Sequence, residues 1–194
     1  MVKVSRVPTK EWDKYKSIIN DFMDEDAGKQ PFVWLRKINQ PLAYGEDGGI
    51  RYLPVILEGL FQYNYIRTWP ANKNTLSGEL EGENMVLYIS ARILRENGYV
   101  NEFGYPDLNW SEDRFLLNGK IYKPDGDTQV AQARDEALLF FIILKREEPQ
   151  EATQILNSQT GIVQVVKSGT VSEEDHTGST LIQVLPNLLK KYFK

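Results

Sequence analysis

The residues that most invite a chemical interpretation lie in one acidic run near the end of the chain, which also holds its single histidine. The run is Glu173-Glu174-Asp175-His176-Thr177, and the sequence contains no cysteine. A zinc site there would need carboxylates for its other ligands, which is an uncommon set. A Ser-His-Asp triad can join residues distant in sequence, but no Gly-x-Ser-x-Gly turn accompanies this histidine. We therefore interpret His176 as a solvated loop residue.

A second group of oxygen-bearing side chains has the spacing of a calcium-binding loop. Asp125, Asp127, Gln129 and Glu136 match four ligand positions of an EF-hand. Val130 stands where that loop needs glycine for its sharp bend, and no helix clearly precedes it. A turn is the simpler interpretation. Adjacent acids elsewhere, such as those at 46–47 and 112–113, are typical of a solvated surface. The sequence thus predicts no catalytic residue, no metal site and no cofactor, and a protein that is not an enzyme.

Composition narrows the class of partner. The 194 residues carry a net charge of −4 with a pI near 5.2, which argues against a large basic surface that wraps nucleic acid but leaves room for a local basic patch. Without cysteine there is no disulfide, which fits an intracellular or virion setting. No run of 18 apolar residues and no apolar signal-peptide core is present, so we expect no membrane partner.

The fold is indicated most clearly by residues 113–146. Asn118-Gly119 separates two β-prone runs, and both residue types tolerate the positive φ angles of a two-residue type I′ hairpin. Pro124-Asp125-Gly126 predicts a second turn. Residues 137–144 are eight apolar residues without interruption and predict a buried strand. For residues 127–136 we favour a polar loop, and a helix is the alternative.

Other segments add a helix and several strands. Residues 1–8 are expected to form a short extended arm, and Thr9 can cap a helix with an apolar face at Trp12, Tyr15, Ile18, Ile19 and Phe22. That face predicts packing on the core, and a docking helix for a partner is the alternative. Strands are expected at 32–38 and 85–90, and a short helix at 91–97. Residues 52–69 are β-prone, but Pro54 and Gly59 indicate an edge, a bulge or a bend. Residues 71–83 form a long polar loop.

The composition changes after Pro149. Residues 150–180 are rich in Gln, Ser, Thr and Gly, with one strand candidate at 162–166. Residues 181–194 are amphipathic, and Pro186 would break or start a helix there. The sequence therefore predicts a mainly β (α+β) protein, a small β-barrel or sandwich with an N-terminal helix, long loops and a C-terminal extension. We divide it into an arm and helix (1–28), a barrel core (29–148) and an extension (149–194), which is either an ordered arm or disordered alone.

The segment from Asp113 to Tyr122, followed by a polar interval and the apolar residues 139–146, resembles the head-closure (stopper) and neck proteins of tailed bacteriophages. In that family a hairpin with Asn-Gly and a following tyrosine precedes a last apolar strand that ends in Lys-Arg, here Lys145-Arg146. The similarity covers about residues 30–148. The tail after Pro149 has no counterpart, and many stoppers are shorter.

This resemblance implies a structural virion protein, made in the bacterial host cytoplasm and placed at the head–tail junction. It would form a ring of six or twelve copies between the portal or adaptor and the tail proteins. Double-stranded DNA would pass through the ring without sequence recognition, and Glu79, Glu81 and Glu83 in the polar loop would repel its phosphates. The extension would reach a neighbouring subunit, with residues 162–166 adding a strand to an exposed edge. Its expected partner contacts are Ile162, Val163, Val165, Val166, Leu185, Leu188, Leu189, Tyr192 and Phe193.

Two rival functions come from other classes. A β-barrel could bind single-stranded nucleic acid, with Tyr63, Tyr65 and Trp69 as a stacking platform. The acidic pI and the presence of only Arg67 nearby speak against this function, and buried core aromatics explain the tyrosines more simply. An enzyme that uses carboxylates on a small barrel is the third class, which no motif supports.

Overall fold

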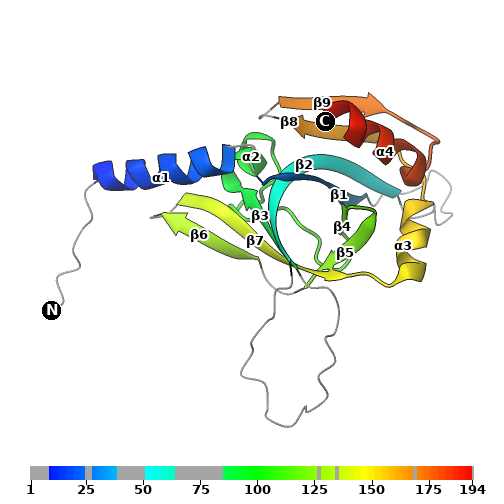
Figure 1. Ribbon diagram of the computed structural model, residues 1–194, viewed down its shortest axis with the longest axis horizontal. Helices are drawn as coiled ribbons and strands as arrows, with labels where there is room; N and C mark the ends of the chain where they lie inside the picture. Colours follow the sequence, from blue (N-terminus) through cyan, green and yellow to red (C-terminus); the bar gives the residue numbers. More distant parts are fainter. Residues whose placement is uncertain are drawn as a thin grey trace, which may run out of the picture.

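The fold is a closed six-stranded β-barrel with a helix near each end of the chain, in a computed structural model that describes residues 9–24, 28–38, 51–63, 85–125, 128–133, 136–167 and 170–193 (Figure 1). The prediction of a mainly β protein with a small barrel and an N-terminal helix is confirmed.

Six strands close the barrel in the order β1-β4-β5-β7-β3-β2, and β2 pairs with β1 to complete it. The strands of the barrel are β1 (Gln30–Ile38), β2 (Arg51–Tyr63), β3 (Met85–Ser90), β4 (Arg114–Leu117), β5 (Lys120–Pro124) and β7 (Glu136–Arg146). All six pairings inside the barrel are antiparallel. Two strands are longer than their barrel neighbours, and each has room along one side for a further strand as well as its barrel partner.

The barrel interior follows from the alternation of side chains along each strand. Phe32 and Trp34 of β1 point inward, where they meet Phe115 of β4 and Phe140 of β7, all at most 1% exposed. The rings of Trp34 and Phe115 stack with centroids 6.1 Å apart. Successive residues of a strand face opposite sides of the sheet, so every second residue of a barrel strand points into the interior.

Gly59, one of the two residues that predicted an edge, a bulge or a bend, lies where β2 passes close to β3. A Cβ atom there would lie 2.7 Å from Leu87 Cδ1 and 3.0 Å from the carbonyl oxygen of Tyr88, so only glycine lets β2 approach β3 this closely. The suggestion of an edge strand is wrong, because β2 pairs with β1 on one side and with β3 and a further strand on the other.

The Asn-Gly hairpin is confirmed. Asn118 and Gly119 have φ angles of 50° and 76° and join β4 to β5. The predicted buried strand at 137–144 is also confirmed, as β7. The prediction of a loop at 127–136, with a helix as the alternative, is wrong for residues 129–133. They form β6 (Gln129–Ala133), which pairs with the first half of β7. β6 has no apolar run to predict it, so its partner strand decides its conformation.

Residues 149–167 and 170–193 form a second layer on the barrel. Of the two alternatives for the extension, an ordered arm or a disordered one, the structure shows an ordered segment, which packs on its own chain. The layer contains α3 (Pro149–Leu156), β8 (Ile162–Lys167), β9 (Thr170–Asp175) and α4 (Leu181–Tyr192). β8 adds in parallel to β2 of its own chain, and β9 pairs with β8. Pro186 lies inside α4, at an exposed position, and does not end it.

The second layer explains why β1 is apolar on both faces. Val33 and Leu35 point out of the barrel and pack with Val163, Val165 and Leu185, all at most 1% exposed. Burial of such a side chain contributes about 1.5–3 kcal/mol before the entropy cost of ordering it. The barrel and the second layer are therefore one packed unit.

Two helices lie on the other side of the barrel. α2 (Ala91–Glu96) follows β3 directly and buries Ala91 and Leu94. α1 (Thr9–Asp24) confirms the predicted N-terminal helix and contacts β3 and β7 (Figure 1). Tyr15 and Ile18 of α1 are 57% and 51% exposed, so core packing is wrong for these two residues. Within the described segments, no helix combines the length and apolar character needed to cross a membrane.

Candidate functional site

The most distinctive surface is the loop that joins α2 to β4. It presents Phe103, Tyr105 and Trp110, which are 76%, 43% and 37% exposed. We call these three residues the aromatic loop. Large aromatic side chains at the surface are enriched in interfaces, where they act as anchors in the partner.

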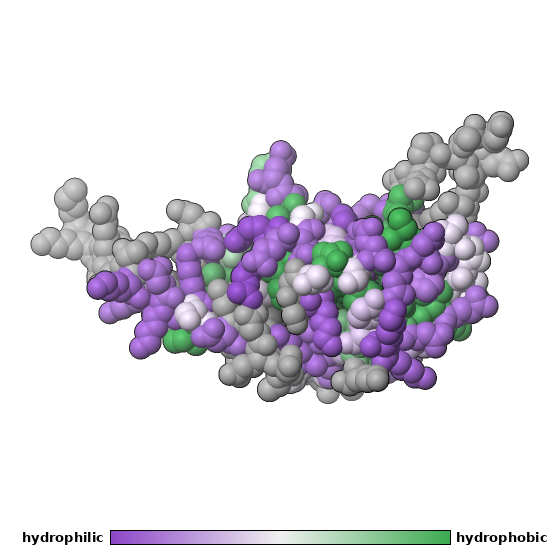
Figure 2. Space-filling model, turned by 90° about the horizontal axis from the view of Figure 1, so that it is seen from above, coloured by the Kyte–Doolittle hydropathy of each residue, from purple (hydrophilic) through white to green (hydrophobic). Residues whose placement is uncertain are grey.

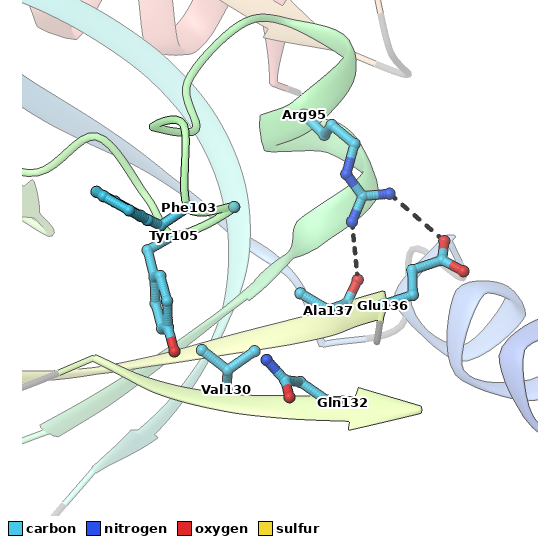
Figure 3. Close-up of a pocket in the computed structure, with 8 residues that line it drawn as sticks. Arg95, Phe103, Tyr105, Val130, Gln132, Glu136 and Ala137 are labelled. Atoms are coloured by element: carbon cyan, nitrogen blue, oxygen red, sulfur yellow. Dashed lines mark hydrogen bonds and ion pairs between the residues drawn. The ribbon is translucent and has the colours of Figure 1, made fainter. Parts of the chain in front are cut away.

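Two hollows lie on either side of Tyr105. The first, of about 240 Å³, is bounded by Phe103 and Tyr105 of the loop, Val130 and Gln132 of β6, and Arg95 of α2 (Figure 3). The second, of about 310 Å³, lies between Tyr105, Trp110 and Thr128. Figure 3 shows Tyr105 pointing from the loop toward β6. The aromatic loop and β6 thus form one shallow surface with room for side chains of a partner.

The base of the loop is held by a buried carboxylate. Asp113 is 2% exposed and accepts three hydrogen bonds, from Trp34 Nε1 at 3.0 Å, the Lys37 amide at 3.0 Å and the Asn109 amide at 3.1 Å. Burial raises the pKa of Asp113, and the three hydrogen bonds oppose that rise because they favour the ionised form. This carboxylate joins the loop to β1 of the barrel.

Ion pairs hold the sides of the same loop. Arg36 of β1 pairs with Asp107 at 2.5 Å, and its guanidinium lies 5.0 Å from the centre of the Trp34 ring and 5.6 Å from that of Tyr99. Lys37 pairs with Glu112, whose pKa is lowered by the hydrogen bond from that lysine. The aromatic side chains are therefore presented on a fixed support, which reduces the entropy lost when a partner binds.

The charged residues beside the first hollow are also paired. Arg95 contacts Glu136 Oε1 at 3.4 Å and donates to the Ala137 carbonyl at 3.1 Å (Figure 3). Lys16 of α1 pairs with the same Glu136, and the hydrogen bond from Lys16 is the main cause that lowers the pKa of this carboxyl. The charged side chains that border the first hollow are therefore held in ion pairs.

Beside the aromatic loop, the sheet has an unpaired edge at β6. Within the described part of the chain, β6 pairs with β7 on one side only, and the same holds for β9 and β8. We call these the open edges of β6 and β9. An open edge presents backbone N–H and C=O groups that a strand from another chain can pair with.

A buried carboxylate elsewhere has a structural role. Glu147 follows β7, is 3% exposed, and pairs with Arg114 Nε at 2.7 Å and with Lys123 Nζ at 3.3 Å. Burial raises its pKa, but the hydrogen bond with Glu151 and the two cations outweigh burial, so its pKa is lowered. The pKa of Glu151, in α3, is raised by its hydrogen bond with Glu147. The cluster connects β4, β5 and α3 at the junction of the two layers.

The chemical candidates from the sequence are not brought together. His176 Nε2 lies 3.3 Å from Glu174 Oε2, and that glutamate also accepts from Lys191 at 2.6 Å and from the hydroxyl of Tyr192. These contacts tie β9 to α4, which is a structural role. Across the residues that the structure describes, no group of three or more His, Cys, Asp or Glu side chains has the arrangement to hold a metal ion.

Most of the predicted partner contacts are core residues of their own chain. Val163, Val165, Val166, Leu185 and Leu188 are at most 3% exposed, Leu189, Tyr192 and Phe193 are half-buried against the second layer, and Ile162 is 47% exposed. For the five buried residues, packing within the chain explains their apolar character and corrects their assignment. For the half-buried residues the assignment stays a prediction. Ile162 alone keeps a largely exposed side chain.

Several other predicted residues fall elsewhere. Glu79, Glu81 and Glu83, together with Tyr65 and Trp69, lie outside the described residues. Tyr63 is 46% exposed at the end of β2 and donates from its hydroxyl to Gln30 Oε1 at 2.7 Å.

The aromatic loop was not among the predicted site residues. Its signal was present as four aromatic residues, Tyr99, Phe103, Tyr105 and Trp110, in a segment without strand or helix periodicity. Aromatic residues in a loop are weakly explained by core packing. Searches of family models, curated proteins and solved structures found no match to this chain.

Proposed function

We propose that this chain is a structural ring subunit of the head–tail junction of a tailed bacteriophage, a neck or head-closure protein of the virion. In this proposal six or twelve copies assemble between the portal or adaptor and the tail proteins. Double-stranded DNA passes through the ring, and the protein performs no catalysis.

One observation carries the proposal. A single closed barrel bears two open edges of different chemistry, in separate parts of the molecule, and an exposed aromatic loop beside one of them (Figure 1). A subunit that contacts its neighbours through two different surfaces forms a head-to-tail interface, and such interfaces close into rings when the rotation between copies allows it.

Two further points support the proposal. The Asn118-Gly119 hairpin and the apolar strand that carry the resemblance to stopper and neck proteins are neighbours in the barrel, joined through β5 and β7. The net charge of −4 suits a subunit that lets DNA slide, because like charge on a channel wall repels phosphate. Glu79, Glu81 and Glu83 are the residues we assign to that wall.

The test is the mass and shape of the purified full-length protein, by light scattering and negative-stain imaging at several concentrations. The proposal predicts rings of six or twelve copies with a central hole. A protein that stays monomeric at high concentration, both alone and mixed with portal rings, would contradict it. Tight and salt-sensitive binding to single-stranded oligonucleotides would instead favour the nucleic-acid-binding class.

A further inference from the structure

The open edge of β9 is acidic, and its carboxylates restrict which strand can lie beside it. Strand alternation places Val171, Glu173 and Asp175 on one face of β9, and all three are exposed. Glu174, on the other face, pairs with Lys191 of α4. A second β9 edge would bring like charges together, which destabilises cross-strand pairs. The edge therefore favours a strand without acids.

One carboxylate oxygen on this edge can accept from another strand. Glu173 accepts a hydrogen bond on Oε1 from Gln164 Nε2 at 2.7 Å, within its own sheet. Its Oε2 has no hydrogen-bond partner among the described residues. Asp175, by contrast, accepts on Oδ1 from both the amide and the hydroxyl of Thr177. An amide side chain placed beside Glu173 would therefore meet an acceptor.

The open edge of β6 offers such an amide. Its sequence, QVAQA, carries no charge. Gln132 is exposed and lies with the half-buried Val130 on the face toward the aromatic loop, where both line the first hollow (Figure 3). β6 thus carries an amide two positions after an apolar side chain, which is the spacing of Glu173 after Val171 on β9.

Parallel pairing of the two edges matches both side chains at once. It sets Val130 opposite Val171 and Gln132 opposite Glu173, and it covers the whole of β6 with the first five residues of β9. An antiparallel arrangement with Gln132 opposite Glu173 would instead set Val130 opposite Asp175. That arrangement would remove water from a carboxylate beside an apolar side chain, which costs free energy.

The placement of the two edges favours a second copy of this chain as the partner. In Figure 1, β6 lies at the left of the barrel and β9 lies at the top of the second layer. One copy can therefore use both edges at once, and such contacts are head-to-tail. Figure 2 looks down on the side of the second layer, where hydrophilic residues cover most of the surface. An interface at β9 thus depends on paired backbone groups and polar side chains.

We propose that the open edge of β9 accepts the open edge of β6 from a second copy as a parallel strand, with Val130 opposite Val171 and Gln132 donating to Glu173. The barrel sheet of one copy then continues into the second layer of the next. The inference rests on the proposed function in one respect, because repeated contacts of this kind form a ring only when they close. It names the surfaces through which neighbouring subunits meet.

Cysteine cross-linking tests the pairing directly, because the chain contains no cysteine of its own. The proposed register sets Ala131 opposite Ser172. Neighbouring strands lie about 4.8 Å apart, which is within the Cα separation that a disulfide can span. Full-length Ala131→Cys and Ser172→Cys variants, one carrying a mass tag and both shown by circular dichroism to be folded, are mixed at high concentration and oxidised with copper–phenanthroline. We predict a cross-linked dimer of the two variants that neither variant forms alone.

A second pair of variants checks the direction of the strands. Gln129→Cys and Thr170→Cys should also cross-link in the parallel register. Antiparallel pairing that keeps Ala131 opposite Ser172 would set Gln129 opposite Glu174 instead. Failure of this second pair, a cross-link between two Ala131→Cys chains, or no cross-link in the first mixture would each overturn the inference.

A change of charge at Gln132 gives a graded result. Gln132→Glu sets a carboxylate against Glu173 and should slow cross-linking in the first mixture about threefold, and Glu173→Gln on the partner should restore the rate. Gln129→Glu is the matched control, because it makes the same change on the other face of β6, opposite Thr170. Equal slowing by the two substitutions would overturn the contact between Gln132 and Glu173.

A chain that carries Ala131→Cys and Ser172→Cys together separates the inference from the proposed function. A series of cross-linked oligomers that ends at six or twelve copies would support both. Cross-linked chains that lengthen without such an end would keep the inference and contradict the ring. Rings seen by imaging without cross-links at these positions would remove the inference and leave the proposed function intact.

Discussion

The two open edges of the sheet differ in chemistry although they arise in the same way. β2 and β7 each pair with an additional strand next to a barrel partner, and these additional strands close no further ring. The β6 edge is uncharged and lies beside exposed aromatic rings and two hollows. The β9 edge is acidic and belongs to the second layer, where α4 packs against β8. Like charges discourage two β9 edges from pairing with each other, which favours contact between unlike edges in the proposed ring.

Loss of the buried carboxylate that supports the aromatic loop should give the largest decrease in the free energy of unfolding. Asp113→Ala leaves Trp34 Nε1 and two backbone amides without their acceptor in a buried place, which we expect to cost about 3 kcal/mol of the free energy of unfolding. Urea denaturation measures the change. Asp107→Ala, on the same loop but exposed, should cost less than about 1 kcal/mol. Equal losses in the two variants would show that the loop is not held by Asp113.

The close approach of β2 to β3 at Gly59 should give the next largest effect. Gly59→Ala places a Cβ within 2.7 Å of Leu87, and we expect a loss of about 1–3 kcal/mol in thermal or urea unfolding. Gly161→Ala is the matched control, because its nearest neighbour would lie 4.0 Å away. A neutral Gly59→Ala would mean that β2 approaches β3 less closely than described.

The contribution of the contact between β9 and α4 to stability should depend on pH, because it includes the carboxylate of Glu174. Hydrogen bonds from Lys191 and Tyr192 lower its pKa to about 2. A lowered pKa stabilises the fold above the carboxyl's ordinary value of about 4.5, and that contribution is lost as pH falls from about 4.5 toward 2. Glu174→Gln should cost about 1 kcal/mol at neutral pH and less in acid. The melting temperature of both proteins across pH 2–7 checks this, with Glu173→Gln as control, and a pH-independent difference would contradict it.

The aromatic loop itself should contribute least to stability and most to association. Phe103→Ala and Tyr105→Ala should change the free energy of unfolding by less than about 0.5 kcal/mol, because both side chains are exposed. The proposed ring should nevertheless need higher protein concentration to form. Ile182→Ala, exposed on α4, is the control for a general loss of apolar surface. Unchanged assembly would remove the aromatic loop from the interface.

Local patterns predicted the elements whose conformation is decided by nearby residues. The turn at Asn118-Gly119, the apolar run of β7 and the helix after Thr9 are of this kind. β6 and β9 are polar and were missed, since each is a strand only because a partner strand supplies its hydrogen bonds. Alternation alone cannot reveal that the outward face of β1 is covered, because the covering residues follow more than a hundred positions later.

The residues of the candidate site divide in the same way, between those that nearby sequence explains and those that distant contacts explain. The sequence suggested chemistry at the acids and the histidine. In the structure, Asp113, Glu147 and Glu174 are buried or half-buried and connect different elements of the fold. The aromatic loop depends on Asp113 reaching Trp34, 79 positions away, and no spacing rule connects the two.

Amide hydrogen exchange of the full-length protein, below and above the concentration of assembly, tests the central claim of assembly through unlike edges most directly. The account predicts new protection on assembly at residues 101–110 and 129–133 and at the β9 edge, 170–175, with the barrel strands β1 and β5 unchanged. Equal exchange at both concentrations, or protection confined to other surfaces, would contradict it.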